Sequence, residues 1–212
     1  MPLPILPTPH LSRPCPVQPL PGGQGLGLLR GRVHEICGPA RRTLAAMILG
    51  ESAGPVIWIA PAWAPERIYT AGLVAYGDPA RLVHVHPRRP EDLLWAAEEA
   101  LRSGAAPLVV AELPEPPGLT PVRRLHLAAG AGADLARHRG RLPPLGLLLT
   151  PGSGGAQGVE SRWHLEPRPS GSTLVELHEA WALSRLRARM EPPATWPLRR
   201  DMQGRITLGA AE

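Results

Sequence analysis

The chain has 212 residues, 43% of them apolar, which is enough for one well-cored folded domain and excludes a disordered protein. Its 23 basic residues are all arginine, and the net charge of +5 permits an acidic partner or nucleic acid without requiring either. No apolar run approaches the ~20 residues of a membrane helix, and the N-terminal residues lack the cationic start and apolar segment of a secretory signal, so we expect a cytoplasmic protein without membrane contact.

Proline dominates the N-terminal part of the sequence. Residues 1–20 contain seven prolines. Proline removes amide donors and fixes φ, so we expect a flexible arm over residues 1–21 without regular structure. A glycine-rich loop over residues 21–25 then leads into a core domain over residues 22–190.

Apolar strands alternate with helices from residue 31 onwards. We expect strands at 33–37, 55–60, 82–85, 107–111 and 145–149, and helices at 44–49, 66–76, 90–103 and 120–139. In the last helix, Thr120 is the expected cap and Pro121 the first helical residue, while the interior glycines Gly130 and Gly132 weaken the prediction. The strands lack in–out alternation, so helices should cover both faces of a mainly parallel sheet in an α/β fold.

The pattern changes after residue 150. A flexible glycine-rich loop is followed by short segments with polar alternation at 163–165, 174–177, 181–186 and 196–198. We expect these segments to form antiparallel strands that extend the same sheet, with a C-terminal strand and tail over residues 191–212.

The segment between the first strand and helix is built like a phosphate-binding loop but lacks its chemistry. Such a loop needs a lysine for the phosphates and a Ser/Thr hydroxyl for magnesium. This chain contains no lysine, and its loop reads Gly38, Pro39, Ala40, Arg41, Arg42 and Thr43. A bulky planar guanidinium replaces a compact ammonium poorly. We therefore expect a structural turn that binds no cofactor; a divergent ATP site that uses Arg41 or Arg42 is the alternative.

Most of residues 22–165 resemble the RecA recombinase core. Residues 31–39 resemble the strand and turn that enter its nucleotide site, 65–69 the segment after its second core strand, and 100–110 the helix and strand of its second acidic motif. Two residues depart from that pattern, since Ala62 stands where RecA has its catalytic glutamate and Glu112 where it has an aspartate. The resemblance implies a RecA-like core that is not an enzyme.

A RecA-like core without the lysine and the catalytic acid resembles the ImuA family, which is grouped with SulA-like proteins. The matching segments are 34–40, the Trp58 strand, 94–104, 123–129, and the segments around Trp163, Trp181 and Trp196. This resemblance implies an accessory role in the SOS response to DNA damage, in mutagenic translesion synthesis. The implied partners are RecA, an ImuB-type Y-family polymerase homologue and, indirectly, an error-prone C-family DNA polymerase. A SulA-like cell-division inhibitor is the alternative.

Candidate partner-binding residues are Trp95, Arg123, Arg124, Arg185, Arg187, Arg189 and Trp196. Trp95 lies off the apolar stripe of its predicted helix, so it can anchor an interface. The arginines at 185, 187 and 189 alternate, so they are expected to line one strand face that meets an acidic protein patch or tracks DNA phosphates. An ordinary solvated face is the alternative.

Two histidines invite a metal-site interpretation. His84 and His86 are two residues apart on a predicted strand and therefore share a face. The sequence places no third ligand beside them, although Cys37 ends a strand that could be a neighbour. Two ligands do not define a zinc site, so we expect core or strand-end histidines and no metal.

Overall fold

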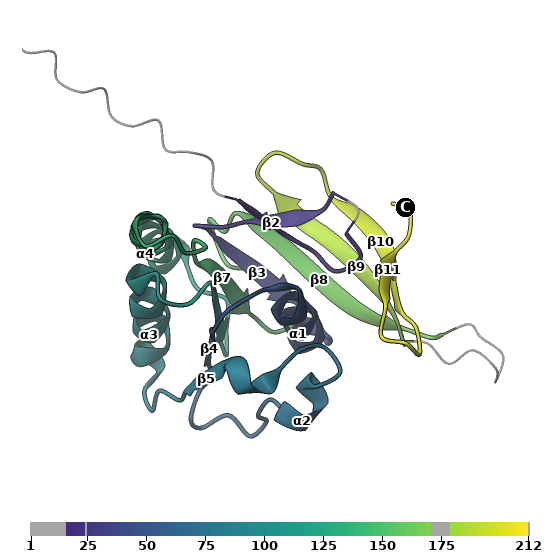
Figure 1. Cartoon of the computed structure of the whole chain (residues 1–212), viewed down its shortest axis with the longest axis horizontal. Helices are drawn as coiled ribbons and strands as arrows, with labels where there is room; N and C mark the ends of the chain where they lie inside the picture. The colour runs from purple at the N-terminus through teal and green to yellow at the C-terminus, as the bar shows by residue number, and fades with distance from the viewer. Residues whose placement is uncertain (1–15, 24, 171–178, 212) are drawn as a thin grey trace, which may run out of the picture.

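One large mixed sheet organises the residues that the computed structural model describes, namely 16–23, 25–170 and 179–211 (Figure 1). Within them its strand order is β11-β10-β9-β8-β3-β7-β6-β4-β5. The six strands from β8 to β5 run parallel: β8 (Ser161–Arg168), β3 (Val33–Cys37), β7 (Leu145–Leu149), β6 (Leu108–Glu112), β4 (Val56–Ile59) and β5 (Leu82–Val85). The remaining strands are antiparallel to their neighbours: β9 (Glu179–Ala188), β10 (Ala194–Arg200) and β11 (Ile206–Leu208).

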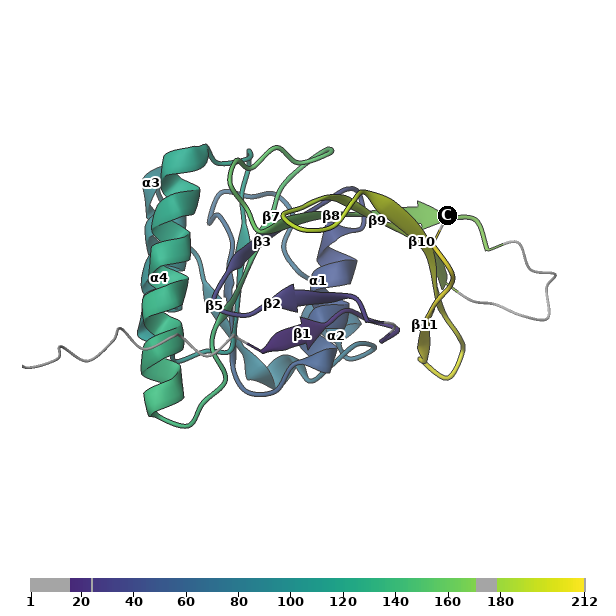
Figure 2. The same cartoon turned by 90° about the horizontal axis from the view of Figure 1, so that it is seen from above.

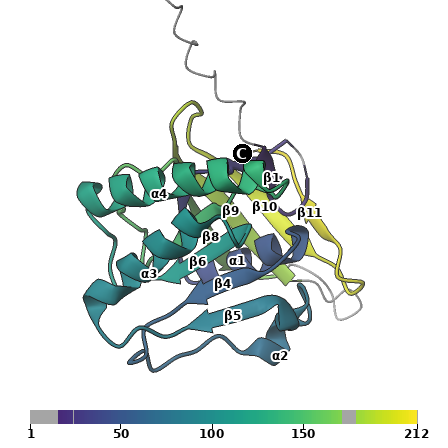
Figure 3. The ribbon, with the colours of Figure 1, turned by 60° about the vertical axis from the view of Figure 1, so that its left-hand side comes forward.

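Helices cover both faces of the parallel half. On one face lie α3 (Pro90–Ser103) and α4 (Leu119–His138), which Figure 3 shows in front of the strands. On the other face lie α1 (Arg41–Glu51) and a hairpin of β1 (Val17–Pro19) and β2 (Gly27–Leu29). The central strands β3, β6 and β7 are therefore buried along their whole length, which confirms the predicted mainly parallel α/β sheet.

The antiparallel strands extend the same sheet, as the sequence predicted. In Figure 2 they curl around α1 and the β1–β2 hairpin, so their concave side completes that half of the core. Side chains of β8 alternate between buried and half-exposed, because only this concave side is covered. The strand predicted at 174–177 lies outside the described residues.

Helices α3 and α4 approach each other closely at Gly132. A methyl group there would collide with the carbonyl oxygen of Leu101, whereas one at Gly130 would meet nothing within 4 Å. Tertiary packing thus compensates for the low helix propensity of glycine, and α4 runs unbroken through both positions. No helix in the described part of the chain has the length and apolar character to cross a membrane.

Three predictions of local structure are wrong. Val17–Pro19 form strand β1 instead of irregular chain, and proline is tolerated because it ends a strand of only three residues. The helix expected over 66–76 shrinks to α2 (Thr70–Leu73), of which only Leu73 is buried, followed by the 3₁₀ turn η1 (Pro79–Arg81). Because this segment buries so little apolar surface, it cannot offset the free-energy cost of nucleating a longer helix. Helix α4 starts after Gly118 without a side-chain cap, so Thr120 is not its cap.

Candidate functional site

The predicted phosphate-loop segment joins the end of β3 to the start of α1 in only three residues, 38–40. Gly38 has φ +92°, which favours glycine, and its amide donates to the carbonyl of Gly152 at 2.8 Å. The amide of Ala40 donates to the carbonyl of Leu165 at 3.2 Å, and that of Arg41 to Gly38 at 3.3 Å. An anion cradle needs amides that point freely at the ligand. Here the amides of residues 38, 40 and 41 are already bonded to carbonyls of the chain, so these three do not point freely at a ligand.

The two loop arginines make different contacts. Arg41 donates to the carbonyl of Gly38 at 3.2 Å, and Thr43 lies in the first turn of α1. Arg42 forms ion pairs with Glu112 at 2.7 Å and with Glu66 at 3.0 Å. Burial alone would lower the pKa of Arg42, but hydrogen bonds to Glu112 and Glu66 raise it overall. Its charge is therefore neutralised by the protein's own carboxylates.

Glu112 is the centre of this arrangement, which we call the Arg42 latch (Arg42, Glu66, Glu112 and Trp58). Glu112 ends β6, is buried, and accepts from the indole Nε1 of Trp58 at 2.8 Å through the oxygen that Arg42 leaves free. Trp58 itself is fully buried in the core. Glu66 and Glu112 both pair with Arg42, Glu66 from the surface and Glu112 from the interior.

A cavity of about 260 Å³ lies beside the latch, at the carboxyl edge of β4 and β6. It is lined by Arg41, Arg42, Pro61, Trp63, Ala64, Pro65, Glu66, Glu112, Leu113 and Pro114. Trp63 is 45% exposed, and position 62 beside it is an alanine, which has no carboxylate. Ligands of open α/β sheets bind at this edge. The lining offers an aromatic ring and prolines for apolar contact beside the two arginines, of which Arg42 is already paired with Glu112 and Glu66.

Glu35 secures the loop that follows β7. Its buried carboxylate accepts from Thr150 Oγ1 at 2.6 Å and from the amides of Gly155 and Ala156 at 2.9 and 3.0 Å, and it pairs with Arg162. A buried charge is tolerated because every contact is a charge-assisted hydrogen bond. The loop after β7 is therefore tied down from inside the protein by a single carboxylate.

His34 lies beside Glu35 in β3, but its side chain points to the opposite face of the sheet. Its Nε2 donates to the carbonyl of Leu29 at 3.0 Å, and its Nδ1 accepts from Ser161 Oγ at 2.7 Å. Ser161 in turn accepts from the indole of Trp163 at 2.7 Å. Both ring nitrogens are hydrogen-bonded in the neutral form, and burial lowers the pKa of His34 to about 4. Buried, hydrogen-bonded roles for His34 and Glu35 were not predicted from the sequence. Two polar residues inside a strand with apolar neighbours were the signal that could have indicated them.

The candidate partner residues on the helices lie at the surface. Trp95 is 60% exposed on α3, as predicted. Arg123 is exposed on α4, and the neighbouring Arg124 pairs with Glu98 of α3 at 2.8 Å. Because Glu98 is three residues from Trp95 on one helix, the structure brings Trp95 and Arg124 to the same side of the α3–α4 pair.

The prediction that Arg185, Arg187 and Arg189 line one strand face is wrong. Arg185 is opposite Trp163 whereas Arg187 is opposite Arg162, so a bulge at Leu186 reverses the alternation. Arg187 and Arg189 are exposed, and Arg189 lies 3.9 Å from Glu160.

Arg185 points into the concave core and is not a surface contact. It is 7% exposed, lies over the rings of Trp163 and Trp196 at 5.7 and 5.1 Å, and donates to the carbonyl of Pro192. Trp196 is 8% exposed in the same stack, so it cannot serve as an exposed anchor. Stacking between two indoles stabilises the buried guanidinium.

The histidine pair lies on the free edge of the sheet. The rings of His84 and His86 stack at 5.8 Å, and His86 Nδ1 donates to the carbonyl of Ala60 at 3.3 Å. Cys37 is not their neighbour, because β7, β6 and β4 separate β3 from β5. Burial raises the pKa of Cys37 to about 12, which makes it a poor nucleophile. Among the described residues no three metal-ligating side chains gather in one place.

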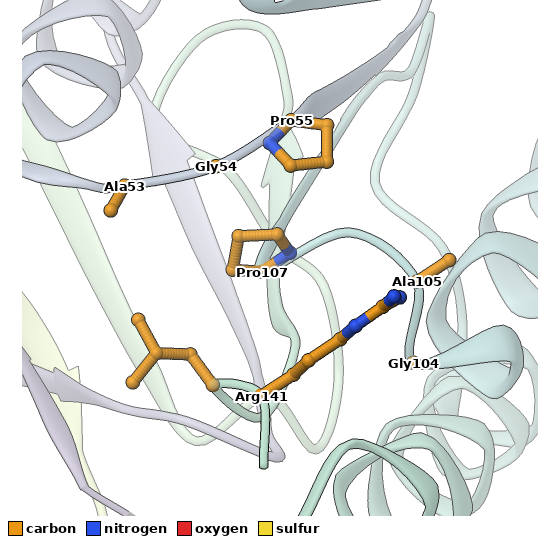
Figure 4. A pocket seen from close by; sticks show the side chains of 8 residues that line it. Ala53, Gly54, Pro55, Gly104, Ala105, Pro107 and Arg141 are labelled. Carbon is orange, nitrogen blue, oxygen red and sulfur yellow. The ribbon is translucent and has the colours of Figure 1, made fainter. Parts of the chain in front are cut away.

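A second cavity of about 350 Å³ opens at the opposite, amino-terminal edge of the parallel strands (Figure 4). It is lined by Ala53, Gly54, Pro55, Gly104, Ala105, Pro107, Arg141 and Leu142. Arg141 runs across it towards Ala105 and is its one charged lining residue. The lining contains no nucleophile, no acid–base pair and no metal-ligand set.

In sequence comparisons the chain matches no protein-family profile and no curated protein.

Proposed function

We propose that the protein is a non-catalytic RecA-like binding protein of the cytoplasm, in which the edge that holds nucleotide in RecA has become a protein-contact surface. The observation that carries the proposal is the closed loop. Amides of residues 38, 40 and 41 are bonded to carbonyls of the chain, and Arg42 is held by Glu112 and Glu66. A phosphate group would have to displace these partners in order to use the same donors.

The biological setting follows from the family resemblance of the sequence. An ImuA-type accessory protein of damage-induced translesion synthesis would contact RecA and an ImuB-type polymerase homologue. The cavity beside Trp63 supports such a role, since an exposed tryptophan among prolines suits a partner's apolar side chain. The exposed Trp95 on α3 is a second anchor, far from the loop in sequence and suited to the other partner.

Equilibrium binding of ATP, with and without magnesium, tests the closed loop. We expect no calorimetric signal at millimolar nucleotide. Micromolar, magnesium-dependent binding would overturn the proposal and favour a divergent ATPase in which an arginine replaces the lysine.

Partner capture tests the contact surfaces. The immobilised protein is expected to retain RecA filaments and to change their rate of ATP hydrolysis. Trp63→Ala should weaken this capture, and Trp95→Ala should weaken capture of the ImuB-type protein. Trp63 and Trp95 are both exposed, so each variant is also the folding control for the other. Undiminished capture by both variants would contradict the assigned surfaces, and no capture by the wild-type chain would contradict the function.

A further inference from the structure

One face of the antiparallel strands carries no covering helix in the described part of the chain. Helix α1 and the β1–β2 hairpin fill the concave side, while α3 and α4 lie over the parallel strands (Figure 2). The strand register places the following residues on the convex side of β8 to β11: Arg162, His164, Glu166, Arg168, Ala180, Ala182, Ser184, Arg187, Thr195, Pro197, Arg199 and Thr207. We call this set the convex face.

Arginines stand at both ends of the convex face. Arg187 is at one end, and Arg168 and Arg199 are at the other. All three are exposed, and within the described ranges none of them forms an ion pair with a carboxylate. Arg187 is opposite Arg162, six residues before Arg168 on β8, so the two ends are about 20 Å apart. Glu166 is the one acid of this set, so the face is positively charged.

Small and hydroxyl-bearing side chains fill the middle of the face. Ala182 and Pro197 are cross-strand neighbours, and Ser184 Oγ lies 2.9 Å from Thr195 Oγ1. Only one hydroxyl hydrogen is used between Ser184 and Thr195, so the other can donate outwards. A chain with a regular series of anions can therefore lie close to the sheet between the arginines.

We propose that the convex face binds the phosphate backbone of a single nucleic-acid strand without reading its sequence. Arginines and hydroxyls are the usual donors to phosphate oxygens. The face has no tryptophan, tyrosine or phenylalanine, and its one aromatic ring, that of His164, lies beside Glu166, so the face lacks both a row of stacking rings and the large apolar anchor that a protein partner would need. Its convex shape suits a flexible strand better than a stiff duplex. This inference is separate from the proposed protein contacts at Trp63 and Trp95.

Fluorescence anisotropy with a labelled thymidine oligonucleotide of about 30 residues tests the proposal. Three phosphate contacts predict that log K falls with log salt with a slope of about −2. The triple variant Arg168→Gln/Arg187→Gln/Arg199→Gln should weaken binding at least tenfold at low salt and flatten this slope. All three side chains are exposed, so the fold should persist.

A matched control removes the same charge elsewhere. Arg67, Arg88 and Arg89 are exposed at the carboxyl edge of β4 and β5, and their triple glutamine variant should bind the oligonucleotide nearly as the wild type does. Equal losses in the two triple variants would show attraction by net charge alone and overturn the assignment. The assignment would also be overturned if the oligonucleotide did not bind at low salt, if a duplex of the same length bound more tightly, or if polyglutamate competed equally well. RecA capture should be the same for the wild type and the Arg168/Arg187/Arg199 variant, which separates this test from that of the proposed function.

Discussion

Acidification should destabilise the protein through one buried histidine. Both nitrogens of His34 are hydrogen-bonded in the neutral form, and burial lowers its pKa to about 4. In the unfolded chain a histidine has its ordinary pKa of about 6.5. Between these two values the unfolded state binds more protons than the native state, so stability falls as the pH falls.

The size of this effect follows from the two pKa values. Linkage predicts that His34 alone removes about 2 kcal/mol between about pH 7.5 and pH 5, and about 3 kcal/mol once the pH is below 4. Almost none of the loss occurs above about pH 7, where the histidine is neutral in both states.

Urea unfolding at about pH 7.5 and at about pH 5 measures this loss of stability. His34→Gln cannot titrate, so its stability should fall by about 2 kcal/mol less than that of the wild type. His138→Gln, at an exposed histidine of α4, should keep the wild-type dependence. If wild type and His34→Gln lost equal stability on acidification, the assignment of a neutral, fully bonded His34 would be refuted.

Three further predictions concern packing and the buried charges. Gly132→Ala should lower the free energy of unfolding by about 2 kcal/mol through the clash with α3, whereas Gly130→Ala should raise it by up to about 1 kcal/mol; equal effects in urea unfolding would contradict the close approach. Arg42→Met leaves Glu112 buried and unpaired and should cost about 3 kcal/mol, of which a second change, Glu112→Gln, recovers at least half; a double variant no more stable than the single one would argue against the latch. Arg185→Met keeps the packing volume but loses the indole stacking and the ion pair with Glu191, so it should cost about 1 kcal/mol and change the near-ultraviolet circular dichroism of the tryptophans; an unchanged spectrum would contradict the stack.

Local patterns were sufficient wherever one short segment carries its own signal. Helix α3 extends from Pro90 to Ser103 as predicted, because a first-turn proline, two acids and a terminal glycine define its ends. Strands β3 and β7 also have their predicted bounds, since continuous apolar runs between turn residues suit a strand covered on both faces. Where the segment buries little, as at α2, the same kind of pattern overestimated the helix.

The sequence by itself determined the alternation of strands and helices and the absence of a phosphate-loop lysine. Only the tertiary structure decided which charged side chains are buried and which partner each of them meets. Arg42 meets Glu112 from 70 residues away, Glu35 reaches the loop after β7, and one extra residue in β9 turns Arg185 into the core while Arg187 stays outside. These outcomes depend on strand order, register and a bulge. All three are fixed by contacts between segments distant in the chain, because the free energy of burying a charge depends on which partner the fold places beside it.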